Sequence, residues 1–214
     1  MSGKLITLEG PEGSGKSTQA QIMIRRLGEL GIEAIYTREP GGTMLGEAIR
    51  DILQHNAAGE TPCERAELLL FEASRNQLVE KVIRPALAKG TWVICDRFID
   101  STTAYQGYGR GLPIDEVQAI NSFAINWIAP DLTLLLDLNI DTGFERISQR
   151  FLQLGESADR FEKEERSFHE KVRQGYLSQA ETEPERFRIV DASQDPQAVS
   201  VNIWTAIEPL IGQE

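Results

Sequence analysis

Gly10-Pro11-Glu12-Gly13-Ser14-Gly15-Lys16-Ser17 stands near the start of the chain and has the spacing G-x-x-x-x-G-K-S. The run 4–9 before it predicts a short buried strand, and the run 18–24 after it predicts a helix. A glycine-rich loop between a strand and a helix can wrap closely around an anion, because its backbone N–H groups point inward. A turn that binds nothing is the alternative, and the flanking strand and helix argue against it. The stretch therefore predicts a phosphate site.

The residue types in this loop suit a nucleoside triphosphate. The helix that begins near Gly15 adds unpaired N–H groups and the positive end of its dipole. Lys16 supplies a mobile cation for the outer phosphates, and the Ser17 hydroxyl can ligate a magnesium ion. We therefore assign triphosphate binding to Gly10, Pro11, Glu12, Gly13, Ser14, Gly15, Lys16, Ser17 and Thr18.

Length and composition narrow the class of protein. The chain has 214 residues, of which 41% are hydrophobic, and this predicts one domain with a sizeable core. Its net charge of −11 argues against a broad nucleic-acid-binding surface, although a few local arginines can still bind a small anion. Cys63 and Cys95 are far apart, which favours structural thiols in a reducing compartment. No run approaches ~20 apolar residues and no signal peptide is recognisable, so we expect a cytoplasmic protein without membrane contact.

Short apolar runs alternate with longer helical patterns along the chain. Four further strands are expected at 33–37, 91–95, 132–138 and 187–191. Helices are expected at 44–55, 63–88 with a kink or restart at Pro85, 114–127, 141–182 with an interruption near Gly155, and 196–211. This alternation predicts an α/β fold, a five-stranded parallel sheet with helices on both faces. Ligands bind beyond the carboxyl ends of such strands, so polar groups that follow strands should gather on one rim.

Asp96 and Arg97 directly follow the expected third strand. An aspartate at that position can hold the magnesium shell, either directly or through water. Arg97 is a candidate clamp on a second phosphate group, because the planar guanidinium makes two parallel hydrogen bonds. The alternatives are a turn-capping aspartate and a surface ion pair.

Two more segments carry candidate acceptor-site residues. Glu39 follows the second strand in a loop shaped by Pro40 and two glycines, where it either orients an arginine or is simply solvated. Phe71 and Arg75 are four residues apart and share one helix face. An aromatic ring for a base and an arginine for a phosphate suit a nucleoside monophosphate, although a Phe in an apolar helix is usually core.

The segments 101–107 and 141–182 are rich in polar groups. The first, Ser101-Thr102-Thr103-Ala104-Tyr105-Gln106-Gly107, continues from the third strand and can line the same cleft, or it can be a polar helix start. The second interleaves arginines with carboxylates and either forms a mobile lid over the transferring phosphate or a solvated helix with i,i+4 ion pairs.

Taken together, these segments resemble the thymidylate kinase family, the nucleoside monophosphate kinases that phosphorylate dTMP with ATP. The most specific part is 96–106, Asp-Arg-Phe-Ile-Asp-Ser-Thr-Thr-Ala-Tyr-Gln, which is similar to the family signature D-R-Y/H/F-x-x-S-x-x-A-Y-Q. The resemblance implies the P-loop nucleoside monophosphate kinase fold in a single domain, 1–214, with a short lid at about 146–166. It also implies ATP and Mg²⁺ as cofactors, a magnesium site at Ser17 and Asp96, and, by analogy, a homodimer with 68–83 or 117–128 as interface candidates.

The resemblance also implies roles for the acceptor residues. Arg75 and Arg97 would bind the dTMP phosphate, and Phe71 would stack on thymine. Thr102 and Gln106 would contact the base, and Tyr105 would lie against the deoxyribose and disfavour a 2′-hydroxyl. The remaining substrate-binding candidates, which would help to arrange the monophosphate site, are Glu12, Glu39 and Arg50.

The position of the catalytic arginine varies within this family. Some members carry it inside the phosphate loop and others in the lid. Residues 11–14 contain no arginine, so the chain resembles the bacterial type, in which the lid supplies the charge. Arg150 and Arg160 are the candidates, with Arg160 preferred, and they join Lys16 and Arg97 as expected catalytic residues.

Three other functions fit parts of the pattern. Another small-molecule kinase would share the phosphate loop but prefer another acceptor. A nucleotide-driven switch would hydrolyse ATP without an acceptor, which the polar acceptor segment 101–106 argues against. A nucleic-acid-dependent ATPase conflicts with the acidic charge balance.

Overall fold

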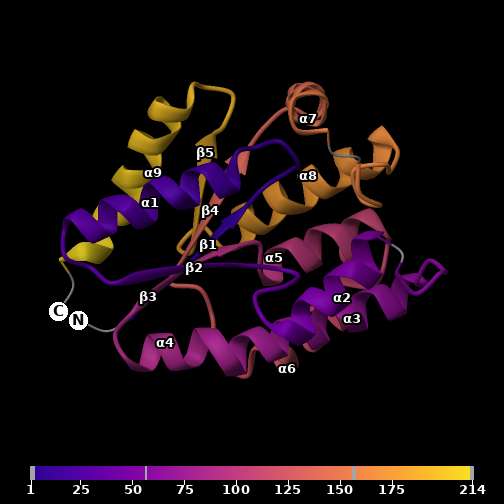
Figure 1. Ribbon diagram of the computed structural model, residues 1–214, viewed down its shortest axis with the longest axis horizontal. Helices are drawn as coiled ribbons and strands as arrows, with labels where there is room; N and C mark the ends of the chain where they lie inside the picture. Colours follow the sequence, from indigo (N-terminus) through magenta and orange to yellow (C-terminus); the bar gives the residue numbers. More distant parts are fainter. Residues whose placement is uncertain (1–2, 56, 156–157, 213–214) are drawn as a thin grey trace.

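The fold is built on one parallel sheet. The computed structural model describes residues 3–55, 57–155 and 158–212. The sheet has five strands in the order β2-β3-β1-β4-β5 (Figure 1), and each neighbouring pair is parallel. The strands are β1 Leu5–Glu9, β2 Ala34–Arg38, β3 Trp92–Asp96, β4 Leu132–Asp137 and β5 Phe187–Asp191. The predicted fold class is confirmed, and the strand bounds differ from the expected ones by one residue at most.

Side chains of the central strands alternate between two buried layers. Leu134 and Leu136 of β4 join the cluster formed with α1 (Lys16–Glu29) and α9 (Pro196–Ile211), whereas Leu135 joins a cluster on the opposite face. This alternation follows from the period of two along a strand. Because both faces are covered, these strands are almost wholly apolar. Figure 1 shows α1 and α9 on one side of the sheet and the helices from α3 to α6 on the other.

The remaining helices match the expected pattern with two refinements. Their bounds are α2 Met44–His55, α3 Glu64–Leu78, α4 Arg84–Ala88, α6 Ile114–Ile125, α7 Ile140–Leu154 and α8 Arg166–Thr182. The expected helix at 63–88 is interrupted by the π-helical turn η1 (Val79–Ile83), and Pro85 lies in the first turn after it. The predicted restart near Pro85 is confirmed. Its physical reason is that proline lacks an N–H and its ring displaces the carbonyl group one turn back. Gly155 at φ 67° ends α7, and residues 158–165 also lie outside a helix, so the interruption before α8 is longer than expected.

The segment after β3 is helical, which the sequence left open. Helix α5 (Ile99–Thr102) runs directly into the π-helical segment η2 (Thr103–Gly109). The polar residues of 101–106 are buried here, where η2 packs against α8. A buried helix with polar side chains shows little hydrophobic periodicity, so the pattern of apolar residues did not reveal it.

The parallel strands place their carboxyl ends on one rim, as predicted. Glu9 ends β1, Arg38 ends β2 and Asp96 ends β3, and the phosphate loop, Glu39 and Arg97 follow them directly. In the described ranges, no helix is long and apolar enough to cross a membrane. Because these strand ends lie on one rim, segments that are far apart in the sequence meet there.

Candidate active site

The phosphate loop is held by tight backbone contacts. Gly10 has φ 139° and Gly13 has φ 73°, and a Cβ on Gly13 would lie 2.6 Å from the carbonyl oxygen of Gly143. Lys16 Nζ donates to the carbonyl oxygens of Gly10 at 3.0 Å and Pro11 at 2.9 Å. These hydrogen bonds hold the Lys16 ammonium group inside the loop.

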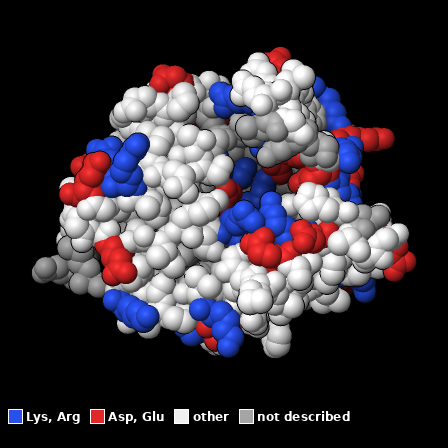
Figure 2. Space-filling model, in the orientation of Figure 1, with Lys and Arg blue, Asp and Glu red and all other residues white. Residues whose placement is uncertain are grey.

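A large cavity of about 820 Å³ opens beside this loop. Figure 2 shows basic side chains gathered in a hollow between α7 and α2 on this face of the molecule. The cations that line the cavity come from five different segments and are Lys16, Arg38, Arg50, Arg97, Arg146 and Arg150. A chain of net charge −11 therefore concentrates positive charge where phosphates would bind.

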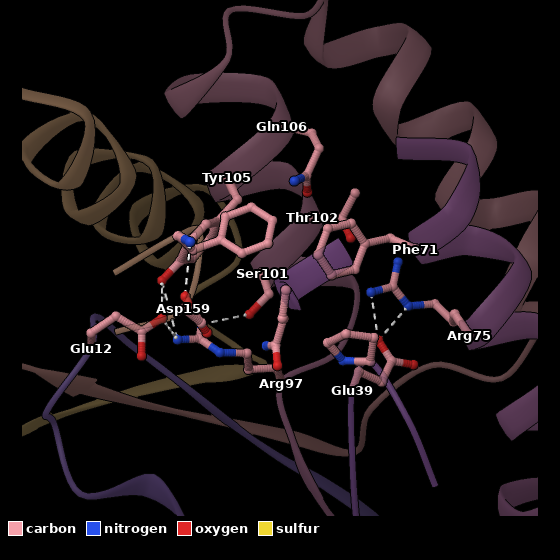
Figure 3. Close-up of a pocket in the computed structure, with 13 residues that line it drawn as sticks. Glu12, Glu39, Phe71, Arg75, Arg97, Ser101, Thr102, Tyr105, Gln106 and Asp159 are labelled. Carbon is pink, nitrogen blue, oxygen red and sulfur yellow. Dashed lines mark hydrogen bonds and ion pairs between the residues drawn. The ribbon is translucent and has the colours of Figure 1, made fainter. Parts of the chain in front are cut away.

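Arg97 and Glu12 connect the phosphate loop to the end of β3. Arg97 Nη2 lies 2.5 Å from Glu12 Oε1 and 3.1 Å from the hydroxyl of Tyr105, which itself donates to Glu12 at 2.9 Å (Figure 3). Burial alone would raise the pKa of Glu12, but the charges of Arg97 and Lys16 and the Tyr105 hydroxyl lower it to about 2. Glu12 therefore stays ionised and holds the Arg97 guanidinium at the centre of the site.

The buried carboxyl group of Glu9 holds two residues that follow Arg97 in the chain. Arg97 has φ 69°, in the left-handed region. The N–H of Phe98 donates to Glu9 Oε1 at 2.8 Å, and Ser101 Oγ, which lies 3.2 Å from Arg97 Nη1, donates to Glu9 Oε2 at 2.6 Å. Burial, together with the charge of Asp100, raises the pKa of Glu9 to about 8. Sequence reasoning missed Glu9, although a carboxyl at the end of an apolar strand was the available signal.

Arg75 lies in a different environment from Arg97. Its side chain is 1% exposed, and all five of its N–H groups have acceptors. The acceptors are Glu39, Glu72, Asn121 and the carbonyl oxygen of Phe98. Arg75 must therefore exchange a partner before it can bind a phosphate. Sequence reasoning missed both Glu72 and Asn121: the i,i+3 spacing of Glu72 and Arg75 on one helix was an available signal, whereas Asn121 lies 46 residues away and no local pattern connects it to Arg75.

A smaller pocket adjoins the large cavity. It contains Phe71, Thr102, Tyr105 and Gln106, all of which the sequence assigned to the acceptor base and sugar. Figure 3 shows these side chains facing a common space, with Arg75 at one side and Arg97 at the other. Both hollows share the residues Glu12, Glu39, Gln54, Arg97 and Asp159. The two hollows therefore meet at Arg97.

The expected metal ligands also lie together in the large cavity. Ser17 and Asp96 both line it beside Lys16, and the Tyr36 hydroxyl donates to Asp96 at 3.4 Å. Hydroxyl and carboxylate oxygens are hard ligands of the kind that Mg²⁺ prefers, so the donor set fits. Among the described residues, no group of three or more His, Cys, Asp or Glu side chains is arranged for a metal ion. Phosphate oxygens and water would therefore supply the remaining ligands.

The two candidate lid arginines are placed differently. Arg150 lines the large cavity and donates to Glu162 at 2.6 Å. Arg160 donates through Nε to the carbonyl oxygen of Leu53 at 2.8 Å and pairs with Glu67 at 2.6 Å. Arg50, expected near the monophosphate, also lines the large cavity and donates to the Pro40 carbonyl at 2.9 Å. Of the two lid candidates, Arg150 lines the large cavity beside the phosphate loop, whereas Arg160, which the sequence analysis preferred, is held against α2 and Glu67.

A third hollow of about 370 Å³ also adjoins the phosphate loop. Its walls are residues 13–15, Arg146 and the segment 192–196 that follows β5. Arg146 spans it, donating to the carbonyl oxygen of Ala192 at 2.9 Å. Sequence reasoning missed this place because Arg146 is one of many lid charges and 192–196 has no motif.

A phosphate loop at the end of β1, a basic cavity and an adjoining pocket that contains Phe71, Tyr105 and Gln106 define a phosphate-loop nucleotide kinase. The thymidylate kinase family model matches residues 8–203. A thymidylate kinase from Ectopseudomonas mendocina is 46% identical over 99% of this chain and 98% of its own, and one from Desulfovibrio desulfuricans is 48% identical over 95% and 94%. The crystal structure of thymidylate kinase from Ehrlichia chaffeensis superposes with a TM-score of 0.77 at 32% identity, covering 97% of this chain and 99% of that one. The chain belongs to the thymidylate kinase family.

The position of Lys16 predicts a pH dependence. Burial, together with the charge of Arg97, lowers its pKa to about 8. We expect kcat/KM for ATP to fall above pH 8, by roughly tenfold per pH unit, because neutral Lys16 cannot pair with phosphate. The fall in kcat should begin at higher pH, because bound phosphates raise the pKa of Lys16. Steady-state kinetics from pH 6.5 to 10 measure both.

A substitution separates Lys16 from Glu9, which titrates in the same range. In Lys16→Arg the break near pH 8 should disappear, because a guanidinium stays charged throughout. A break that persists in Lys16→Arg would assign the titration to another group.

Proposed function

We propose that the protein transfers the γ-phosphoryl group of ATP to dTMP, giving ADP and dTDP for dTTP synthesis. The observation that carries the proposal is the meeting of two hollows at Arg97 and Glu12, one beside the phosphate loop and one lined by Phe71, Thr102 and Gln106. A donor triphosphate in the first and an acceptor monophosphate in the second would bring their phosphates together there.

Catalysis in this arrangement consists of alignment and charge neutralisation. The acceptor phosphate oxygen is already an anionic nucleophile, so no strong general base is needed. Arg97 holds that phosphate in line, while Lys16 and Arg150 neutralise charge on the moving group. Ser17 and Asp96 would hold Mg²⁺, which supplies charge neutralisation on the donor phosphates when bound. Closure of the lid, at about 146–166 within a single kinase domain, excludes water and suppresses ATP hydrolysis.

The residues that line the smaller pocket are assigned to contacts with the acceptor dTMP. Phe71 stacks on thymine, Thr102 and Gln106 contact the polar edge of the base, and Tyr105 lies against the deoxyribose. Arg75 supports the site by ordering Glu39, to which it donates from Nε at 2.8 Å. Direct binding of the acceptor phosphate is assigned to Arg97, with Arg50 and Glu12 arranging the approach.

An acceptor panel tests the function. Coupled ADP production at fixed ATP and magnesium should favour dTMP over dUMP, dCMP and dAMP. Arg97→Ala should lose at least ~100-fold in dTMP turnover, because a charge-stabilising donor is removed, while the Kd for ATP changes little. The exposed Arg65→Ala is the matched control and should behave as wild type. Unchanged kinetics in Arg97→Ala, or rapid ATP turnover without any acceptor, would contradict the proposal.

A pair of lid variants tests which arginine serves catalysis. Arg150→Ala should lower kcat by ~10³-fold or more with a smaller change in KM for dTMP, as expected of an arginine that stabilises transferring charge. Arg160→Ala should raise KM for dTMP and lower kcat far less, because its guanidinium lies against Glu67 and α2. The reverse pattern in single-turnover measurements would assign the catalytic charge to Arg160.

We also propose a homodimer in which α6 forms part of the interface. Phe123 and Trp127 are four residues apart and are 86% and 94% exposed, and Trp127 is held outward at φ 70°. Leu69 on α3, which packs beside α6, is 58% exposed. Two highly exposed aromatic side chains on one short stretch of chain are unfavourable in a monomer and typical of an interface.

The dimer predicts a mass twice the 23.9 kDa of one chain in light scattering at micromolar concentration. Trp127→Glu and Phe123→Glu should shift the protein to monomer, whereas Leu30→Glu, at an exposed position after α1, should not. A wild-type monomer would refute the dimer. A cytoplasmic location is proposed as well, and the free thiols of Cys63 and Cys95 support it.

A further inference from the structure

The carboxylate of Glu67 joins three segments of the chain. Glu67 lies on α3 and is 1% exposed. It accepts hydrogen bonds from Gln106 Nε2 at 2.9 Å and from Arg110 Nε at 3.1 Å, and it pairs with Arg160 Nη2 at 2.6 Å. Glu67 therefore links the acceptor pocket, the end of η2 and the lid.

The contact with Glu67 determines how Gln106 presents its amide. A carboxylate can only accept hydrogen bonds, so Gln106 must turn its NH₂ group toward Glu67. The carbonyl oxygen of Gln106 then remains for another partner. Figure 3 shows the carboxamide directed toward the space that Thr102 and Phe71 also face. An acceptor there suits the N3–H of thymine and opposes the N3 lone pair of cytosine.

The lid segment 159–162 forms one wall of the same pocket. Asp159 and Phe161 line it, and the Phe161 ring lies 5.7 Å from Phe71 and 6.0 Å from Tyr105 between centroids. Asp159 Oδ1 accepts from the N–H of Phe161 at 2.8 Å, which gives the segment a fixed turn. A base in the pocket therefore meets Phe161 only while this segment is docked.

Two sets of contacts hold the segment in place. Arg160 binds the C-terminal part of α2, donating from its backbone N–H to the Gln54 carbonyl at 3.2 Å and from Nε to the Leu53 carbonyl. Two ion pairs, Glu67–Arg160 and Arg110–Glu164 at 2.6 Å, tie it to α3 and η2. We call these two ion pairs the lid latch.

We propose that Glu67 is a positioning residue that couples the acceptor base pocket to the docking of lid residues 159–162. The same carboxylate orients the base-reading Gln106 and holds Arg160, so a filled base pocket and a docked segment stabilise each other. By linkage, a docked lid must also raise the affinity for the acceptor. This inference rests on the proposed function, because it takes dTMP as the acceptor.

Hydrogen exchange measured by mass spectrometry tests the coupling without relying on turnover. In wild type, saturating dTMP should slow amide exchange in 158–164 by about tenfold, a value typical of coupling between two sites. In Glu67→Gln this slowing should drop below about threefold, KM for dTMP should rise about tenfold with little change in kcat, and discrimination against dCMP should weaken. Glu64→Gln, an exposed carboxylate on the same helix, is the matched control and should keep wild-type values.

Arg160→Gln and the double variant complete the cycle. Arg160→Gln should lose the same dTMP-dependent protection, and Glu67→Gln/Arg160→Gln should be no worse than the stronger single variant, because both break one latch. If Glu67→Gln does not fold, Arg160→Gln carries the test alone, since it leaves Glu67 paired with Arg110.

Two outcomes would overturn the coupling in different ways. Wild-type protection of 158–164 in both single variants, with dTMP still phosphorylated, would refute the role of Glu67 and leave the proposed function standing. A wild-type protein that neither binds nor phosphorylates dTMP would overturn the function and the coupling together.

Discussion

The contact between Arg97 and Glu12 is the point on which the site depends. It joins the phosphate loop, which follows β1, to the end of β3, and both hollows of the site open at it. The backbone at Arg97 is left-handed, and the buried Glu9 holds Phe98 and Ser101, which follow it. Strain of this kind persists only where the surrounding structure overdetermines it, and it is characteristic of functional positions. Glu12 lines both hollows, and its carboxylate pairs with the Arg97 guanidinium where they meet.

Three arginines of the site are paired with carboxylates of this acidic chain. Arg97 pairs with Glu12, Arg150 with Glu162, and Arg75 with Glu39, so each of these guanidiniums is positioned by a carboxylate within the site. A buried charge without a partner would be strongly destabilising. Arg97 and Arg150 line the large cavity, and Arg75 lines the smaller pocket. All five N–H groups of Arg75 already have acceptors, which agrees with the supporting role that we propose for it.

The sequence predicted those features that local patterns encode. The phosphate loop, the alternation of strands and helices and the rule that parallel strands end on one rim were enough to bring Lys16, Asp96 and Arg97 together. The resemblance at 96–106 predicts the acceptor segment, and Tyr105 and Gln106 of that segment line the smaller pocket together with Phe71. Its helical form was not predicted, because buried polar residues carry no apolar period.

What the sequence could not reveal were partners that meet only through the fold. Asn121 lies 46 residues from Arg75, and Glu67 lies 39 residues from Gln106, so no spacing rule connects them. Arg160 was preferred over Arg150 from the sequence, but no spacing rule could show where either arginine lies. Both lie in a charged stretch where the sequence pattern does not distinguish one arginine from another. Only the packing of 159–162 against α2 and α3 shows that the two side chains lie in different places.

The different positions of Arg150 and Arg160 bear on how the lid can close. Arg150 lies on α7 over the phosphate cavity, whereas Arg160 lies in the segment that walls the base pocket. Only a short stretch of chain joins the two, so docking of one end limits where the other can lie. Glu162, which pairs with Arg150, also accepts from the N–H of Asp159 at 2.9 Å, and this ties the two ends together directly. In the proposed mechanism, such a lid would not close over the donor phosphates independently of the acceptor base. It would favour transfer to an acceptor over transfer to water, because Arg150, the proposed catalytic arginine, would be best placed when the segment beside the base is docked.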